Sequence, residues 1–190
     1  MIYLASKSPR RQELLQQIDV DFEVVSTDID ETPHTAEKPG EYVKRMAIEK
    51  ALAAYKDSME YPLLAADTSV ICEGRILGKP ENKEDFLGMM ELLSDNTHQV
   101  ITCVAVTTGS NINNVKTRLS VSEVTFSAIP REWAQKYWAT SEPTDKAGGY
   151  AIQGKAAVFI KNINGSYSGI MGLPLYETVD LLEEFTHYSF

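Results

Sequence analysis

The sequence has only two cysteines and no long apolar run. Cys72 and Cys103 lie far apart, in apolar surroundings and outside any Cys-x-x-Cys pattern, which predicts two buried free thiols and argues against a disulfide or a zinc site. No apolar segment approaches the length that spans a bilayer, and the N-terminus lacks the basic flank and long apolar stretch of a signal peptide. We therefore expect a cytoplasmic protein with no membrane partner.

Positive charge is also scarce. The chain has 18 Lys and Arg against 27 Asp and Glu, and its net charge is −9. Such a surface repels a nucleic-acid backbone, and no stripe of basic and aromatic residues offsets the repulsion, so we expect no nucleic-acid partner. A triphosphate would be repelled equally. An enzyme of this composition that acts on nucleotides needs a local cluster of cations and a metal ion.

The sequence contains no repeat, no low-complexity segment and no change of composition that would mark a linker. Its 190 residues, of which 43% are hydrophobic, suffice for one sizeable core, so we expect a single domain over residues 1–190. Strand and helix signals alternate along the chain, which indicates the α/β class. The expected strands are 2–5, 22–26, 63–66, 69–72, 75–77, 100–107, 115–126 and 157–160, and the expected helices are 8–17, 40–55, 82–93, 130–139 and 174–185.

Local residue types refine two of these elements. Ser8 is a typical N-cap, and Pro9 after it suits the first position of a helix. In the strand expected before the fourth helix, the apolar residues change face between Val121 and Val124. A bulge near Glu123 would produce this change.

The segment Ser6-Lys7-Ser8-Pro9-Arg10-Arg11 lies at the turn from the first strand to the first helix. Strand ends of α/β sheets and helix N-termini are common anion sites. Two arginines in a first helical turn are unfavourable by roughly 0.3–1 kcal/mol each, because the helix N-terminus is already partly positive. A bound polyanion would remove this cost, whereas two solvated arginines would simply tolerate it, and the segment alone leaves both open.

Lys50 and Asp67 each have two interpretations, one functional and one purely structural. Lys50 falls on the apolar stripe of the expected helix 40–55, where it either extends along the edge of the core into solvent or reaches a phosphate. Asp67 follows the apolar run 63–66 and is expected at the end of a buried strand. It is either a catalytic or metal-binding carboxylate facing a cleft, or an ordinary turn residue.

Two glycine-containing segments are further candidates. Gly78-Lys79-Pro80 does not form a P-loop, because Gly74 is one residue too close and Pro80 stands where Ser or Thr is required, but Lys79 remains a candidate phosphate ligand. The segment 145–154 has three glycines in seven residues. It permits close approach of the backbone to a ligand, although a plain irregular turn would have the same composition.

The order of these segments resembles the Maf family of nucleotide pyrophosphatases. The matching segments are Ser6–Arg11, Asp30-Glu31, Glu49-Lys50-Ala51, Ala66-Asp67-Thr68, Gly78-Lys79-Pro80, Asp145–Tyr150 with Gln153-Gly154, Asn164–Tyr167 and Gly172–Leu175. They are collinear from residue 4 to about residue 176. Any one of them is weak, but eight in order are highly specific.

The resemblance implies an α/β fold of the Maf/ITPase type, with a mixed sheet flanked by helices, two lobes and a central cleft, in a homodimer. It also implies cleavage of a nucleoside triphosphate to the monophosphate and pyrophosphate with Mg²⁺ or Mn²⁺. The implied roles are water activation by Asp67, metal binding near Glu31 and Asp67, phosphate binding by Ser8, Arg11, Lys50 and Lys79, and substrate specificity from Arg10, Thr68 and Gln153.

The family divides by substrate. The branch that acts on 7-methyl-GTP has a cysteine before the Ala-Gly pair and a glutamate at the glutamine position, whereas this chain has Lys146 and Gln153 and resembles the dTTP/UTP branch. A glutamine amide carries both the donor and the acceptor that match the imide edge of thymine or uracil. Modified pyrimidine triphosphates are the alternative substrates in this house-cleaning role. A nucleotide-binding regulator of cell division without turnover is the alternative function.

Overall fold

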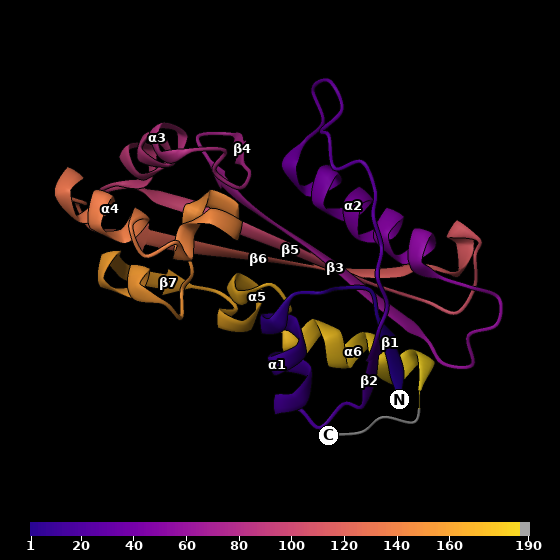
Figure 1. Ribbon diagram of the computed structural model, residues 1–190. Helices are drawn as coiled ribbons and strands as arrows, with labels where there is room; N and C mark the ends of the chain where they lie inside the picture. Colours follow the sequence, from indigo (N-terminus) through magenta and orange to yellow (C-terminus); the bar gives the residue numbers. More distant parts are fainter. Residues whose placement is uncertain (187–190) are drawn as a thin grey trace.

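The computed structural model describes residues 1–186, and a seven-stranded mixed sheet runs through its centre (Figure 1). The strands lie in the order β2 (Phe22–Val24), β1 (Ile2–Leu4), β3 (Leu63–Cys72), β5 (Thr97–Thr107), β6 (Lys116–Phe126) and β7 (Ile160–Asn164), with β4 (Arg75–Leu77) paired to β3. β1 is parallel to β2 and β3, and the other pairs are antiparallel. The expected mixed α/β fold is confirmed; the last four residues of the predicted domain lie outside the described part.

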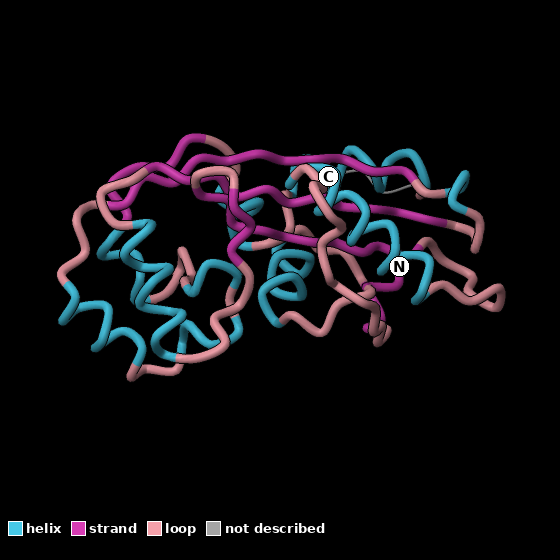
Figure 2. The backbone as a smooth tube through the Cα atoms, turned by 90° about the horizontal axis from the view of Figure 1, so that it is seen from above, coloured by secondary structure: helices cyan, strands magenta, loops and turns pink. Residues whose placement is uncertain are grey.

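Helices cover both faces of this sheet. They are α1 (Pro9–Gln17), α2 (Pro39–Ala54), α3 (Lys83–Leu93), α4 (Arg131–Trp138), α5 (Tyr167–Met171) and α6 (Leu175–Phe185). In Figure 1, α2 lies on one side of the long strands, α1 and α6 lie on the other, and α3 and α4 gather at the far end. Figure 2 shows from above how the long strands extend side by side across the molecule.

Successive residues of β3 enter different hydrophobic cores. Leu63 and Ala65 pack with α2, whereas Leu64 and Ala66 pack with α1 and α6. Further along the strand Val70 joins the core formed with α3 and α4. Because side chains alternate along a strand, Leu64, Ala66 and Val70 lie on the same face. The cores of α1 and α6 and of α3 and α4 therefore occupy two lobes on one face of a shared sheet.

β3 is longer than the strands along one of its edges. β1 pairs with it only up to Leu64, and β4 pairs with it only from Val70. Residues 65–69 therefore have no described strand on this edge. The chain leaves β1 toward α1 at one border of this gap, and it leaves β4 toward α3 at the other. The segment Ser6–Arg11, which follows β1, and the segment Gly78–Pro80, which follows β4, therefore lie at the same opening.

The expected strand break at Asp67 is wrong. β3 continues through Asp67 and Thr68, whose backbones pair with Cys103 and Thr102 of β5. Aspartate is depleted in strands, which is why the sequence indicated an end. The polar pair instead occupies the middle of a ten-residue strand, beside the gap on its edge.

The bulge expected near Glu123 is also wrong, because the pairing of β5 with β6 is unbroken there. The inward positions before it are Ser120 and Ser122, both buried, while Leu119 and Val121 are about half exposed. The apolar phase therefore changes because serines face inward, not because the strand shifts. A register shift does occur near the end of β6, on the side of β7.

The strand expected at 157–160 is a third difference. Residues Lys155–Phe159 form a 3₁₀ helix, and the strand begins only at Ile160. Ala156 and Phe159 are buried three residues apart, which is the 3₁₀ period.

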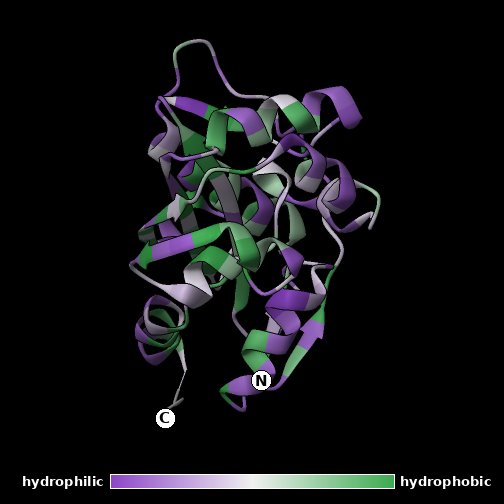
Figure 3. Cartoon of the chain, turned by 90° about the vertical axis from the view of Figure 1, so that its left-hand side faces the viewer, coloured by the Kyte–Doolittle hydropathy of each residue, from purple (hydrophilic) through white to green (hydrophobic). Residues whose placement is uncertain are grey.

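Other features agree with the sequence. Cys72 and Cys103 are buried and free, as predicted. Hydrophobic and hydrophilic residues alternate along the helices (Figure 3), as expected for helices that cover a sheet. No helix within residues 1–186 is both long and apolar enough to cross a membrane.

Candidate active site

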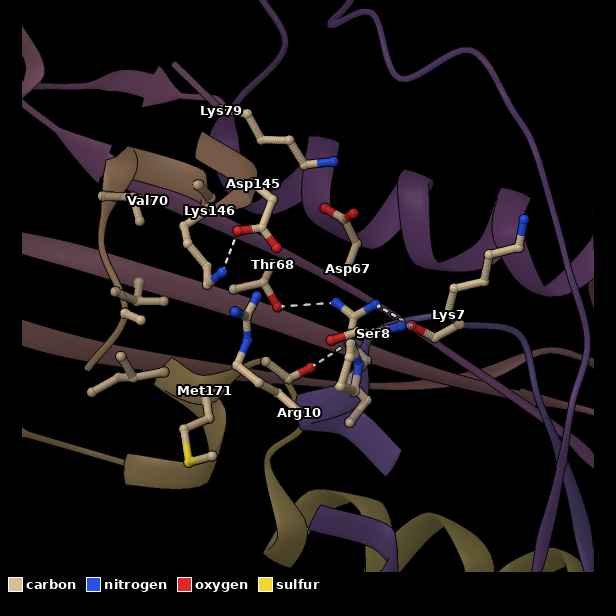
Figure 4. Close-up of a pocket in the computed structure, with 18 of the residues that line it drawn as sticks. Lys7, Ser8, Arg10, Asp67, Thr68, Val70, Lys79, Asp145, Lys146 and Met171 are labelled. Atoms are coloured by element: carbon tan, nitrogen blue, oxygen red, sulfur yellow. Dashed lines mark hydrogen bonds and ion pairs between the residues drawn. The ribbon is translucent and has the colours of Figure 1, made fainter. Parts of the chain in front are cut away.

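A cleft of about 470 Å³ opens at the gap along β3 (Figure 4). Its walls come from the turn between β1 and α1, the loop before α2, α2 itself, β3, β5, the segment after β4, the loop after α4 and the end of α5. All nine site residues expected from the sequence line it: Ser8, Arg10, Arg11, Glu31, Lys50, Asp67, Thr68, Lys79 and Gln153. The structure brings these residues together, and the roles assigned to them stay predictions.

The cleft is rich in positive charge although the chain is acidic. Six cationic side chains line it, namely Lys7, Arg10, Arg11, Lys50, Lys79 and Lys146, against the three carboxylates Glu31, Asp67 and Asp145. The whole chain carries a net charge of −9. This is the local cluster of cations that an acidic protein needs to bind a polyphosphate.

Lys50 joins the two central carboxylates. Its Nζ lies 2.7 Å from Asp67 Oδ1 and 2.8 Å from Glu31 Oε1. The Lys50 side chain is only 13% exposed, so its ammonium ends inside the cleft and the alternative of an ammonium in solvent is wrong. Burial alone would raise the pKa of Glu31, but the hydrogen bond and charge of Lys50 outweigh it and leave the pKa below its ordinary value.

The loop that carries Glu31 is fastened to α2. Arg45 on this helix donates hydrogen bonds of 2.6 and 2.7 Å to the two carboxylate oxygens of Glu37, and a third of 3.1 Å to the carbonyl of Thr32. Tyr42 donates a hydrogen bond of 2.8 Å from its hydroxyl to the carbonyl of Glu31. The same helix therefore positions both the lysine and one of its carboxylate partners.

Arg11 donates three hydrogen bonds to groups at the floor of the cleft. Nε donates to the carbonyl of Gly172 at 2.7 Å, Nη1 donates to Ser6 Oγ at 3.2 Å, and Nη2 donates to Thr68 Oγ1 at 3.3 Å. Burial lowers the pKa of Arg11, and the charge of Asp67 opposes this shift. A guanidinium has five N–H groups, so two remain for a ligand.

Thr102 is a site-supporting residue that the sequence did not reveal. Its hydroxyl lies 2.9 Å from that of Thr68 and hydrogen-bonds to the carbonyl of Gly169 at 2.7 Å. Thr68 is thus fixed from both sides, by this threonine and by Arg11. Thr102 stands in an apolar run of β5, where threonine is common for its strand preference alone, so its position gave no signal.

Other residues present free polar groups to the cleft. Ser8 occupies the N-cap position, as expected, but its hydroxyl makes no capping hydrogen bond. Within residues 1–186, Arg10, Lys79 and Gln153 make no side-chain hydrogen bond or ion pair and are available to a ligand. Figure 4 shows Lys79 extending toward the space in front of Asp67.

Two glycines of the loop 145–154, Gly148 and Gly149, approach the core and not the open cleft. Gly148 and Gly149 have φ values of +64° and +69°. A Cβ on Gly148 would lie 2.9 Å from Val70, and one on Gly149 would lie 2.9 Å from Phe86. These glycines let the loop pack against β3 and α3, which brings the residues after them to the cleft wall.

Glu31 and Asp67 are the residues suited to a divalent cation, because both carboxylates reach the same ammonium and so lie close together. No cluster of three or more His, Cys, Asp or Glu side chains suited to a metal occurs within the described residues. Mg²⁺ is commonly held by one or two carboxylates, with substrate phosphates and waters completing the shell. The two-carboxylate set therefore fits a cation that binds together with a polyphosphate.

The chain is similar to proteins of one family over nearly its whole length. The family model described as "Maf-like protein" matches residues 1–185. A protein of Alkalilimnicola ehrlichii named dTTP/UTP pyrophosphatase is 48% identical over 190 residues, covering 97% of this chain and 92% of that protein. A protein of the same name from Nitrosospira multiformis is 50% identical over 196 residues, covering 96% and 93%. A solved structure of a HAM1 protein from Coxiella burnetii overlaps partially, with a TM-score of 0.49 and 22% identity over 68% of this chain and 74% of that one.

Proposed function

The chain belongs to the Maf family, and we propose that it is a nucleoside triphosphate pyrophosphatase that hydrolyses dTTP and UTP to the monophosphate and pyrophosphate. The observation that carries the proposal is the cleft itself. Six cations surround one buried carboxylate, Asp67, in a protein whose net charge is −9. The names of the relatives, which match nearly the full chain, support the same activity.

The triphosphate is bound by groups that carry no information about the base. Ser8, Arg11 and Lys79 line the cleft, where the Ser8 hydroxyl makes no capping hydrogen bond and two N–H groups of Arg11 are unused. Lys50 adds positive charge from the opposite wall. Most of the rate enhancement comes from these fixed charges, which are arranged before the substrate arrives.

Asp67 acts as the general base. Lys50 hydrogen-bonds to its Oδ1, which orients the carboxylate and leaves Oδ2 to accept a proton from water. The water oxygen forms a bond to the α-phosphorus as the bond from that phosphorus to the bridging oxygen breaks, and pyrophosphate leaves with the electron pair. General-base catalysis of this kind contributes about 10²–10⁴ in rate.

Glu31 and Asp67 would hold a divalent cation, Mg²⁺ or Mn²⁺, together with the substrate. When bound, such a cation neutralises charge on the pyrophosphate leaving group. The position of Glu31 is set by the loop contacts to Arg45 and Tyr42, so these residues support the cation indirectly.

The base is recognised on the wall formed by Gln153. Its amide presents a donor and an acceptor, which complement the imide edge shared by thymine and uracil. Arg10 and the fixed hydroxyl of Thr68 complete this wall. Modified pyrimidines that keep the imide edge are expected to be accepted as well, in keeping with a house-cleaning role.

A panel of nucleotides tests the proposal. Pyrophosphate release is measured with dTTP, UTP, CTP and GTP, in Mg²⁺ and after removal of divalent cations by EDTA. We expect release from dTTP and UTP in Mg²⁺ and its loss in EDTA. Tight binding of dTTP without release from any nucleotide would favour the alternative, a regulator that senses triphosphates. The homodimer and the cytoplasmic location remain predictions, which gel filtration and cell fractionation can test.

A further inference from the structure

Gln153 lies on an irregular segment that two side chains outside the cleft hold in place. Glu142 accepts the backbone N–H of Lys155 with both carboxylate oxygens, at 3.0 and 3.2 Å. Tyr137 donates its hydroxyl to Glu142 Oε1 at 2.8 Å and accepts the backbone N–H of Ala151 at 3.3 Å. The backbone is thus fastened two residues before and two residues after the glutamine.

The contact on the far side of Gln153 depends on a glycine. A Cβ on Gly154 would lie 2.0 Å from Glu142 Oε1, so any larger residue there would displace the carboxylate. Glu142 makes no ion pair within residues 1–186. Its carboxylate therefore interacts with the Tyr137 hydroxyl and the Lys155 N–H.

Tyr137 is a suitable anchor for this segment. It lies on α4, is only 4% exposed and packs against Phe86 and Phe159 in the core. Burial raises the pKa of Tyr137, and the hydrogen bond to Glu142 raises it further, so the hydroxyl stays protonated and donates. Tyr137 therefore connects the segment around Gln153 to the packed core formed with α3 and α4.

We propose that Tyr137 and Glu142 form a positioning pair that fixes Gln153 against the base and so sets the preference for pyrimidine triphosphates. The inference rests on the proposed function. Neither residue lines the cleft, so both act through the backbone of the loop. The residues proposed to bind the triphosphate come from other elements, and their positions do not depend on this pair.

If the pair positions Gln153 alone, its loss should weaken recognition of the base and leave binding of the phosphates unchanged. A hydrogen bond to the base fails if its donor moves by about 1 Å, and such misplacement typically costs tenfold or more in rate. Loosening the pair should therefore lower kcat/KM for dTTP and UTP by about tenfold. It should change kcat/KM for GTP, and the inhibition constant of inorganic pyrophosphate, by less than about threefold, because neither depends on the glutamine amide.

The experiment compares Tyr137→Phe, Glu142→Ala and Glu142→Gln with a matched control, Glu132→Gln, which alters an exposed glutamate on α4. Tyr137→Phe removes a single oxygen, so it keeps the test decisive if Glu142→Ala fails to fold. Glu142→Gln retains one acceptor for the Lys155 N–H and should lose less selectivity than Glu142→Ala. The control should behave as the unmodified protein.

A double-mutant cycle with Gln153→Ala separates positioning from general support. In the Gln153→Ala background, Glu142→Ala should cause no further loss of selectivity. Retained selectivity in Tyr137→Phe and Glu142→Ala would overturn the inference. An equal fall for all nucleotides together with weaker pyrophosphate inhibition would also overturn it, because the pair would then serve stability alone. If the unmodified protein shows no preference for dTTP and UTP, the proposed function fails and this inference fails with it.

Discussion

Replacement of Lys50 by methionine tests the centre of the cleft. Methionine keeps most of the apolar stem, so the packing of α2 should survive while the ammonium between Asp67 and Glu31 is lost. The hydrogen bond to the buried Asp67 is charge-assisted and is worth about 1.5–3 kcal/mol. The bond to Glu31, whose side chain is 53% exposed, adds roughly 0–1 kcal/mol.

We therefore expect Lys50→Met to lower the free energy of unfolding at pH 7 by about 2 kcal/mol, which for a chain of this length corresponds to roughly 4–8 °C in Tm. Turnover of dTTP should fall at least a hundredfold, because Asp67 loses the group that orients it and the cleft loses a cation. Lys44→Met, on the exposed side of the same helix, is the matched control and should change neither quantity.

The stability loss should depend on pH. In the folded protein the pKa of Glu31 lies below its ordinary value of 4.5, with the hydrogen bond to Lys50 opposing the effect of burial. A carboxyl group with a lowered pKa stabilises the fold above its unfolded pKa, and that contribution disappears as the pH falls through the folded pKa. The difference in Tm between the unmodified protein and Lys50→Met should therefore be full at pH 7 and narrow below about pH 4.5. Normal turnover by Lys50→Met, with Tm lowered or not, would refute the role given to this lysine.

Three further substitutions probe other parts of the site. Asp67→Asn is nearly isosteric, so the protein should fold while dTTP turnover falls by about 10²–10⁴, and a folded variant with near-normal turnover would exclude Asp67 as the general base. Gln153→Glu should reduce kcat/KM for dTTP and UTP by roughly tenfold to a hundredfold relative to GTP, and an equal fall for all nucleotides would show that the amide does not contact the base. Gly148→Ala places a Cβ 2.9 Å from Val70 at a positive φ, so thermal melting should show a loss of about 1–3 kcal/mol, and an unchanged Tm would contradict the packing described for this loop.

The sequence predicted most of the elements because their signals are local. Pro9 favours the first position of a helix, the apolar spacing of residues 40–55 favours an amphipathic helix, and the structure has both helices. The spacing also placed Lys50 on an apolar stripe. It could not choose between solvent and the cleft, because that choice depends on what lies opposite the helix, namely Asp67 and Glu31.

The misplaced strand end has a related cause. Asp67 interrupts an apolar run, and a local interpretation ends the strand there. The opening instead arises because β1 stops pairing at Leu64 and β4 starts pairing at Val70, which are contacts between distant parts of the chain. The supporting residues Thr102 and Glu142 were missed for the same reason, since threonine is ordinary in a strand and glutamate is ordinary in a loop.

Hydrolysis of dTTP in water enriched in ¹⁸O tests most directly whether the cleft activates water for attack on the α-phosphorus. The reaction is run with the unmodified protein and Mg²⁺, and both products are analysed by mass spectrometry. We expect one ¹⁸O atom in dTMP and none in pyrophosphate. Label in pyrophosphate, or release of inorganic phosphate in place of pyrophosphate, would contradict attack at the α-phosphorus and the role given to Asp67.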